Sequence, residues 1–133
     1  MTALQPGLKG PWATTVAENM LAESVGSGLV RVFSTAMMIA GMERSAVSAV
    51  QAMLADGLTT VGTQVDVRHL AATPCGMEIR FEAVLTQISP NGKGLTFSVQ
   101  AWDALGLIGE GTHQRVVVNK ARFEAKTAAK GTA

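Results

Sequence analysis

Two titratable side chains, His69 and Glu43, occur in apolar stretches where charged groups are uncommon. Alternation over residues 58–69 predicts a strand whose apolar face carries His69 together with three valines, Val61, Val65 and Val67. Glu43 is the only acidic residue between positions 36 and 55, a stretch that predicts an apolar helix packed against this strand. Buried charged groups need polar partners, so we expect the imidazole and the carboxylate to face each other at a site.

The chemistry available to this pair is proton transfer and nucleophilic attack. An imidazole with a pKa of about 6.5 can take a proton from water or from a hydroxyl near neutral pH. A carboxylate can orient that imidazole or attack a carbonyl carbon directly. Two other interpretations stay open: His69 as a core histidine bonded to backbone carbonyls, and Glu43 as an exposed helix residue.

A candidate hydroxyl, Thr35, precedes Glu43 by eight residues. Eight residues of ideal helix span about 12 Å and turn by about 80°. The two side chains can therefore share a site only if Thr35 lies in an irregular lead-in that folds back beside the helix. By itself, Thr35 is most simply part of a helix N-cap formed with Ser34.

The elements that must position these residues follow from local patterns. The helix of residues 36–55 is apolar nearly all round, which predicts a central helix, and Gly57 is its expected left-handed stop. Strand patterns follow at 58–69, 77–89, 95–103 and 108–118, separated by turn signals at 74–76, 90–92 and 103–106. Short turns between consecutive strands predict an antiparallel meander. The predicted class is α+β, with the hotdog arrangement of an antiparallel β-sheet wrapped round one central apolar α-helix.

The two ends of the chain are less strongly patterned. Residues 18–24 predict one or two helical turns, and the Gly- and Ser-containing residues 24–30 predict a flexible flap. The tail, residues 119–133, is rich in Ala and Lys and predicts a frayed helix or disorder, with cations that could meet a phosphate. No domain boundary is evident, so residues 1–133 are expected to form a single domain.

Composition excludes several classes of protein. A net charge of +1 and 5% aromatic residues argue against nucleic-acid binding, and no apolar run approaches the roughly 20 residues of a membrane span. The single cysteine, Cys75, cannot form an internal disulfide, which favours a cytoplasmic location. No His and Cys cluster has metal-ligand spacing, so no metal or other cofactor is expected. A hydrophobic content of 47% predicts apolar surface buried between subunits, in a homodimer that could pair further into a tetramer.

Four motifs, in this order and spacing, together resemble the fluoroacetyl-CoA thioesterase family of hotdog proteins. They are Val32-Phe33-x-Thr35 before the helix, Met42-Glu43 within it, His69-x-Ala-Ala-Thr-Pro-x-Gly76, and Gly109-x-Gly111-Thr112-His113-x-Arg115. The resemblance implies hydrolysis of a short or small acyl-CoA by a catalytic set of Thr35, Glu43 and His69. It also implies that Gly62 and Arg115 line the acyl-CoA site. Because thiolate is a good leaving group, this chemistry requires no metal.

The chain departs from the family pattern at the flap. The selective member of the family carries aromatic residues before the helix, as a lid over its small fluorinated substrate, and residues 24–30 contain none. We therefore expect a different or broader acyl group. The alternative function is a non-catalytic acyl-CoA-binding or ligand-sensing hotdog protein; a hydratase is disfavoured because the Asp-x-x-x-x-His pattern is absent. Arg115 either faces water or binds a CoA phosphate or the carboxylate, and the role of His113 is left open.

Overall fold

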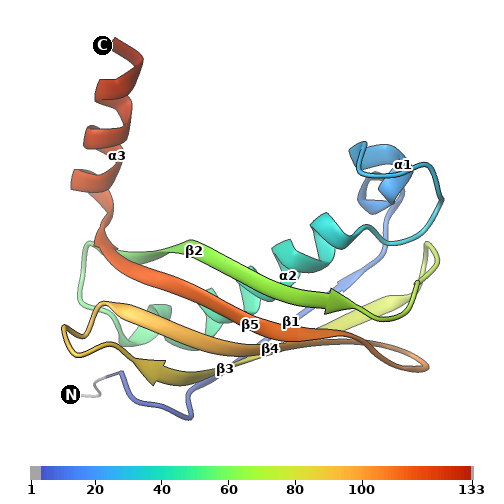
Figure 1. Cartoon of the computed structure of the whole chain (residues 1–133), viewed down its shortest axis with the longest axis horizontal. Coiled ribbons are helices and arrows are strands. Elements are labelled where there is room, and N and C mark those ends of the chain that lie inside the picture. The colour runs from blue at the N-terminus through green and yellow to red at the C-terminus, as the bar shows by residue number, and fades with distance from the viewer. Residues whose placement is uncertain (1–3, 133) are drawn as a thin grey trace.

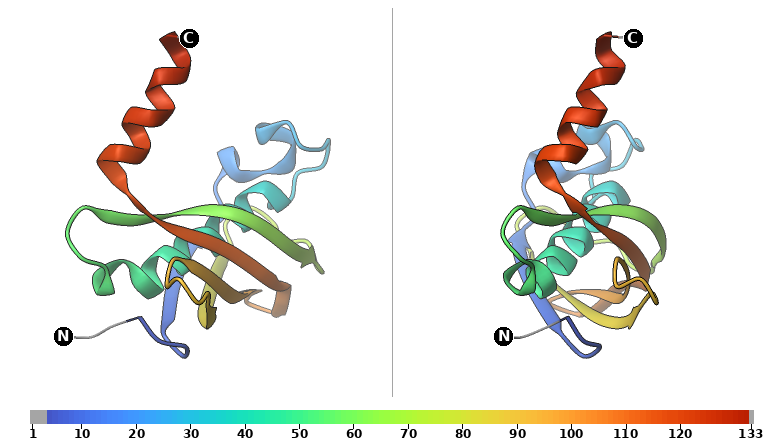
Figure 2. Two further views of the ribbon diagram at one scale, coloured as in Figure 1. Left: turned by 60° about the vertical axis from the view of Figure 1, so that its left-hand side comes forward. Right: turned by 90° about the vertical axis from the view of Figure 1, so that its left-hand side faces the viewer.

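A computed structural model describes residues 4–132 and shows five antiparallel strands curled round one long helix (Figure 1). The helix is α2 (Thr35–Val50), and the sheet has the order β1-β3-β4-β5-β2. The strands are β1 (Lys9–Thr15), β2 (Leu58–His69), β3 (Glu78–Ile88), β4 (Gly94–Asp103) and β5 (Gly106–Asn119). Figure 2 shows α2 in the concave side of this sheet, so the predicted hotdog arrangement is confirmed.

Helix α2 begins where the sequence offers a cap. The Ser34 hydroxyl accepts a hydrogen bond from Met37 N at 3.1 Å, which makes Thr35 the first helical residue. Glycines allow the helix and sheet to approach closely: a Cβ on Gly41 would overlap the Phe81 ring, and one on Gly10 would overlap the helix backbone. The helix face turned to the sheet is buried, and it consists of Met38, Gly41, Met42, Ser45, Ala46, Ala49 and Val50.

The helix differs from the prediction in its length and in how much of its surface is buried. It ends at Val50 and continues only as a 3₁₀ turn, η2 (Gln51–Met53). Gly57 has the predicted positive φ of 84°, but it serves the turn into β2 and does not cap the helix. Ala36 and Ala40 are exposed, so the helix is buried on one side only within a single chain.

The order of the strands corrects the predicted meander. Strands β3, β4 and β5 are consecutive neighbours, but β2 pairs with β5 and lies at the edge of the sheet. The turn signal at 74–76 therefore does not make a hairpin, because residues 70–77 cross to the far side of the sheet. Hydrogen bonds from Phe33 N to Thr73 O, at 2.8 Å, and from Gly76 N to Val16 O, at 2.8 Å, fix this crossing. As a result, the end of β2 lies beside the start of α2.

A β-bulge in β2 changes which side chains face the helix. The register with β5 shifts between Gly62 and Gln64, which leaves Thr63 as an extra residue. Thr60 and Gly62 face inward before the bulge, and Val65, Val67 and His69 face inward after it. Val61 lies opposite Val116 on the outer face. The prediction that Val61 shares a face with His69 is wrong, because strict alternation cannot anticipate the inserted residue.

The segment before α2 and the C-terminal tail contain short helices. Residues 18–24 form η1 (Glu18–Met20) and the start of α1 (Ala22–Val25), as predicted. Arg31 bonds to Glu18 and to Glu23, at 2.7 and 3.3 Å, across this flap. The tail forms α3 (Lys120–Ala128) and η3 (Ala129–Thr132), so of the two alternatives for it the helix is observed (Figure 1). No helix among residues 4–132 is long and apolar enough to cross a membrane.

Candidate active site

Thr35 and His69 meet where α2 begins and β2 ends. The Thr35 Oγ1 and His69 Nδ1 atoms are 2.8 Å apart. Thr35 is exposed and His69 is half-buried, so the pair is open to a ligand. A pocket of about 290 Å³ adjoins it, lined by Val32, Thr35, His69, Leu70, Ala71 and Ala72. This volume suits a small acyl group.

The imidazole of His69 is held neutral. Burial lowers the pKa of His69, and the polar backbone of Ala71 nearby only partly opposes this effect. If Thr35 donates its proton to Nδ1, that nitrogen is the base that activates the hydroxyl. If Nδ1–H donates to Thr35, the lone pair is on Nε2. The Nε2 atom is buried and has no hydrogen-bond partner among residues 4–132.

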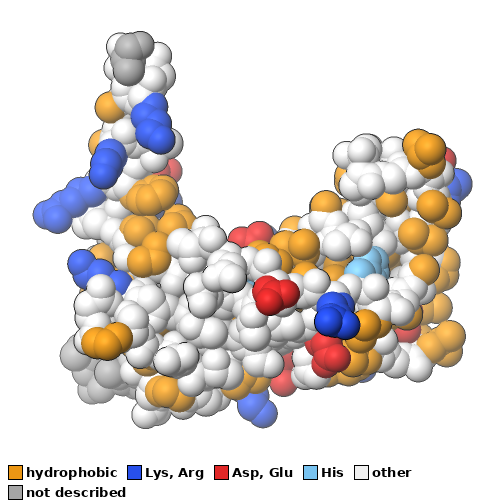
Figure 3. Space-filling view, viewed as in Figure 1, with side chains coloured by type: hydrophobic (Ala, Val, Ile, Leu, Met, Phe, Trp, Pro, Cys, Tyr) orange, Lys and Arg blue, Asp and Glu red, His pale blue; other side chains and the backbone are white. Residues whose placement is uncertain are grey.

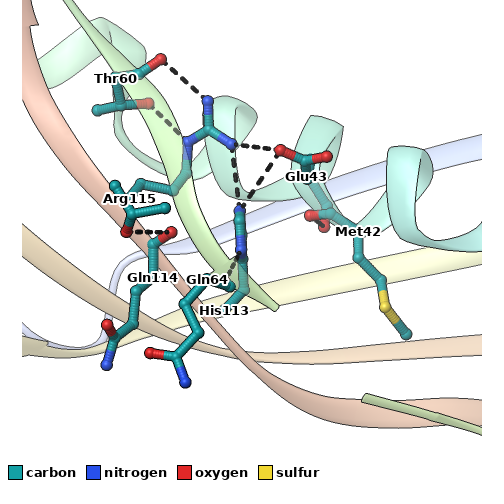
Figure 4. Close-up of polar contacts among 9 residues, drawn as sticks. Met42, Glu43, Thr60, Gln64, His113, Gln114 and Arg115 are labelled. Carbon is teal, nitrogen blue, oxygen red and sulfur yellow. Dashed lines mark hydrogen bonds and ion pairs between the residues drawn. The ribbon is translucent and has the colours of Figure 1, made fainter. Parts of the chain in front are cut away.

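A second polar cluster surrounds Glu43 (Figure 4). Arg115 Nη1 donates to Glu43 Oε2 at 3.2 Å. The other guanidinium nitrogens are fixed by Thr60: Nε donates to its hydroxyl at 2.8 Å and Nη2 to its carbonyl at 2.9 Å. Arg115 is only 7% exposed, whereas the Glu43 side chain is 40% exposed. Arg115 therefore faces inward and presents the carboxylate to solvent. It does not face water, and of the contacts proposed for it the one with the carboxylate is observed.

His113 completes this cluster, and the sequence left its role open. Its Nδ1–H donates to the carbonyl of Gln64, a residue at the β-bulge, over a distance of 2.8 Å. The lone pair of Nε2 then faces Arg115 Nη1 at 3.1 Å. Burial lowers the pKa of His113, and the Arg115 charge adds to this effect. The bond to Gln64 and the Glu43 charge only partly oppose it, so the neutral ring is favoured. A neutral His113 therefore supports the guanidinium that holds Glu43. In the sequence, His113 is two residues before Arg115 on a predicted strand, so the two side chains share a face.

Gly62 leaves the space that the Glu43 carboxylate occupies. A Cβ at Gly62 would lie 2.6 Å from Glu43 Oε2 and 3.4 Å from Arg115 Nη1. No other side chain fits here without displacing the carboxylate. The structure thus brings together Gly62, Arg115 and Glu43, three of the five predicted site residues.

The predicted contact between Glu43 and His69 is absent within the described chain. Thr35 is a regular helical residue and does not fold back, so it is separated from Glu43 by about 12 Å of helix rise. His69 lies opposite Gly109, and Gly62 lies opposite Arg115, six residues further along β5, or about 20 Å. One chain therefore holds two separate half-sites. Among residues 4–132, no three His, Cys, Asp or Glu side chains are grouped so as to hold a metal ion.

Comparison with known proteins agrees with this fold and these motifs. The family model of FlK, the fluoroacetyl-CoA-specific thioesterase, matches residues 16–121. The chain belongs to this family. It is 38% identical to the fluoroacetyl-CoA thioesterase of Streptantibioticus cattleyicolor over 95 residues, which are 71% of this chain and 67% of that protein. The protein is accordingly a thioester hydrolase that acts on acyl-CoA.

Solved structures extend the likeness over nearly the whole chain. A structure of the fluoroacetyl-CoA thioesterase FlK has a TM-score of 0.90 and 29% identity, with 97% of this chain and 98% of that one covered. A Thermus thermophilus thioesterase superfamily member has a TM-score of 0.87 and 28% identity, with 99% and 96% covered. Both alignments include β2, β5 and α2, the elements that carry the two half-sites.

Proposed function

We propose that this thioesterase hydrolyses a short or small acyl-CoA with Thr35, Glu43 and His69 as its reacting groups, and with Gly62 and Arg115 beside the substrate. The hydrogen bond between Thr35 and His69 at the 290 Å³ pocket carries this proposal. His69 takes a proton from water, or from the Thr35 hydroxyl, as the oxygen attacks the thioester carbonyl. The C–S bond breaks, and the CoA thiolate takes up the proton. If Thr35 attacks, water then hydrolyses the acyl ester in a second step.

We further propose that two copies of the chain build each active site. Within one chain the two half-sites are too far apart to act on one carbonyl. Strand β2 is at the edge of the sheet with its outer side unpaired, and its inward-facing Val65 is 38% exposed. An antiparallel pair of β2 strands centred between Val65 and Asp66 would place His69 of one copy beside Gly62 of the other. A homodimer of this kind brings each His69 to the Glu43 of the other copy.

Mixing two inactive variants tests this arrangement. In the dimer proposed, Glu43→Gln and His69→Ala chains combine into heterodimers that carry one intact site and one doubly altered site. Since half of the randomly mixed dimers are heterodimers, the refolded mixture should recover about a quarter of wild-type activity. Each variant alone should be nearly inactive. A mixture as inactive as its components would place the whole site within one chain.

The composition of the flap, residues 24–30, bears on the size of the acyl group that this enzyme prefers. The related enzymes are named for fluoroacetyl-CoA, but residues 24–30 contain no aromatic side chain, and Leu29 is 92% exposed. A lid of this kind encloses a two-carbon acyl group weakly, so we propose better rates on bulkier acyl chains. The profile should be graded, because one methylene changes binding by only about 1–3 kcal/mol. A sharp optimum at fluoroacetyl-CoA would contradict this proposal.

Release of free thiol from a panel of acyl-CoAs tests the function itself. The panel should run from acetyl- and fluoroacetyl-CoA to longer and aryl thioesters, with thiol measured by a chromogenic disulfide. We expect turnover that Glu43→Gln abolishes. Binding without turnover across the panel would instead favour the ligand-sensing alternative. Because acyl-CoA is an intracellular metabolite, we also propose a cytoplasmic location.

A further inference from the structure

A buried carboxylate, Asp103, lies outside both half-sites, at the turn between β4 and β5. It is the last residue of β4 and is paired with Gly106, the first residue of β5. Asp103 is only 9% exposed, and within residues 4–132 it forms no ion pair with a Lys, Arg or His side chain. Burying a charge is costly unless its oxygens are hydrogen-bonded. The proton transfers described above do not use this carboxylate, so its partners indicate what it does.

Two hydrogen bonds hold the carboxylate of Asp103. Its Oδ2 accepts from the Thr73 hydroxyl at 2.7 Å, and its Oδ1 accepts from Leu105 N at 2.9 Å. Burial raises the pKa of Asp103, but the hydrogen bonds from Thr73 and from the turn backbone lower it by more, so the group is ionised. An ionised carboxylate only accepts, so the Thr73 hydroxyl is the donor and the bond is charge-assisted. Thr73, which is fully buried, is thereby fastened to the β4–β5 turn.

Thr73 in turn links the segments that carry Thr35 and His69. Its carbonyl accepts a hydrogen bond from Phe33 N at 2.8 Å. Phe33 is two residues before Thr35, and Thr73 is four residues after His69. Within residues 4–132, no other hydrogen bond between backbone groups joins the segment before α2 to the segment after β2. The relative position of these two segments therefore depends on Thr73.

The pocket beside Thr35 and His69 lies at the surface, and residues 70–72 form one of its walls. Figure 3 shows a histidine side chain at the surface among hydrophobic side chains, below α1 in this view. His113 is only 1% exposed, so this ring is that of His69. Since Thr35 is exposed and His69 is half-buried, packing alone does not fix the pair. Its geometry depends on how the two backbone segments are held.

We propose that Asp103 is a positioning residue of the active site: through Thr73 it keeps Thr35 and His69 at hydrogen-bond distance and holds the pocket wall beside them. The proposal rests on the function proposed above, in which these two side chains react at this pocket. Without the carboxylate, Thr73 loses its anchor, and the carbonyl that holds the segment before α2 is free to shift. A misplacement of about 1 Å between reacting groups can reduce a rate by about 10²-fold.

The kinetics of two Asp103 variants test this role. Asp103→Ala should lower kcat by about tenfold to a hundredfold with little change in KM, because the reacting pair is misplaced while the rest of the substrate site is intact. Asp103→Asn should keep a kcat close to wild type, since its amide can accept from Leu105 N and donate to the Thr73 oxygen. Rescue by asparagine would show that the two hydrogen bonds, and not the negative charge, hold the site together.

A matched control and a second variant separate positioning from folding. Asn91 Oδ1 accepts from the Ser89 hydroxyl at 2.6 Å and from Lys93 N at 2.9 Å, so it makes the same two kinds of contact in the turn between β3 and β4. Asn91→Ala removes them at the other end of the sheet and should keep the wild-type kcat (Figure 1). Thr73→Val tests the same link where Asp103→Ala does not fold. It should lower kcat in the same way, and Thr73→Ser should restore it.

Non-additivity distinguishes positioning from a purely structural role. Adding Asp103→Ala to His69→Ala should cost little further activity, because the side chain that Asp103 positions is already gone. A purely structural role would instead lower the rate by the same factor in both backgrounds, and that result would overturn the proposal. A wild-type kcat in folded Asp103→Ala protein would also overturn it.

Amide hydrogen exchange tests the link independently of turnover. Measured by NMR, the Phe33 N–H should exchange at least about tenfold faster in Asp103→Ala than in wild type, because its acceptor is no longer held. The Val117 N–H, which donates to Lys93 O at 2.9 Å, is the internal reference and should change much less. If no thioester is turned over but exchange at Phe33 still accelerates, the proposed function fails and the link from Asp103 stands. Unchanged exchange at Phe33 would overturn the link itself.

Discussion

Replacing Gly62 with alanine should remove activity without unfolding the protein. The new Cβ would lie 2.6 Å from Glu43 Oε2, and ordinary contacts begin at 3.4 Å, so the oxygen must move by at least 3.4 − 2.6 = 0.8 Å. Oε2 is the atom that accepts from Arg115 Nη1, at 3.2 Å, so this movement disturbs the bond that orients the carboxylate. A misplacement of about 1 Å in a reacting group can reduce the rate by about 10²-fold. We therefore expect kcat to fall about a hundredfold.

Stability should change little, since the Glu43 side chain is 40% exposed and can turn toward water. Urea unfolding should place the free energy of unfolding of Gly62→Ala within about 1 kcal/mol of wild type. Gly94→Ala is the matched control: its Cβ would lie 2.9 Å from a flexible side-chain atom, Ser89 Oγ, and would crowd Ser89 and not Glu43. That variant should keep full activity.

Repeating Gly62→Ala in a Glu43→Asp variant tests whether contact with the carboxylate causes the loss of activity. Glu43→Asp shortens the side chain by one methylene and withdraws the carboxylate from Gly62, so adding Gly62→Ala to it should cost little further activity. The two substitutions are then strongly non-additive, as expected for groups in contact. Wild-type kcat in Gly62→Ala would refute the reasoning, and so would an equal further loss in both backgrounds.

Further outcomes follow from the geometry. Glu43→Gln and His69→Ala should each lower kcat by about 10²–10⁴-fold with little change in urea unfolding. If the Thr35 hydroxyl is needed, Thr35→Ser should have a higher kcat than Thr35→Ala. Equal rates in Thr35→Ala and wild type would exclude a covalent role for this hydroxyl. Burial lowers the pKa of both histidines from 6.5, so the acidic limb of kcat/KM should lie below pH 6.5. The free energy of unfolding should be constant above about pH 7 and fall as the pH drops below 6.5. The lowered histidine pKa values cause this, because the unfolded chain then binds more protons than the folded one. A free energy of unfolding that rises on acidification would contradict the lowered pKa of both histidines. Gly41→Ala should destabilise the protein by about 1–3 kcal/mol in the same urea assay, because its Cβ would overlap the Phe81 ring.

Local patterns in the sequence predicted helix α2 and the strands β2 to β5. Period-two alternation in β3 puts Ile79, Phe81, Ala83 and Leu85 on one face, and all four are buried. The apolar pattern predicted α2, and Ser34 predicted its cap. Gly57 has the predicted positive φ, but the helix that it was expected to end stops at Val50. These features depend on neighbours a few residues apart, so a single sequence carries them. The same is true of the family motifs, whose order and spacing indicated a thioesterase before any contact was known.

Contacts between distant residues were decided only by the tertiary structure. Strand β2 joins β5 instead of β3, and the bulge at Thr63 reverses the faces of the residues before it, so Val61 turns outward while Gly62 faces Glu43. Alternation cannot reveal an inserted residue, and short turn signals cannot reveal a strand that crosses the sheet. The helix rise between Thr35 and Glu43 could be calculated from the sequence. Which partner each side chain then takes, His69 for Thr35 and Arg115 for Glu43, depends on how the edge strand is aligned against the helix.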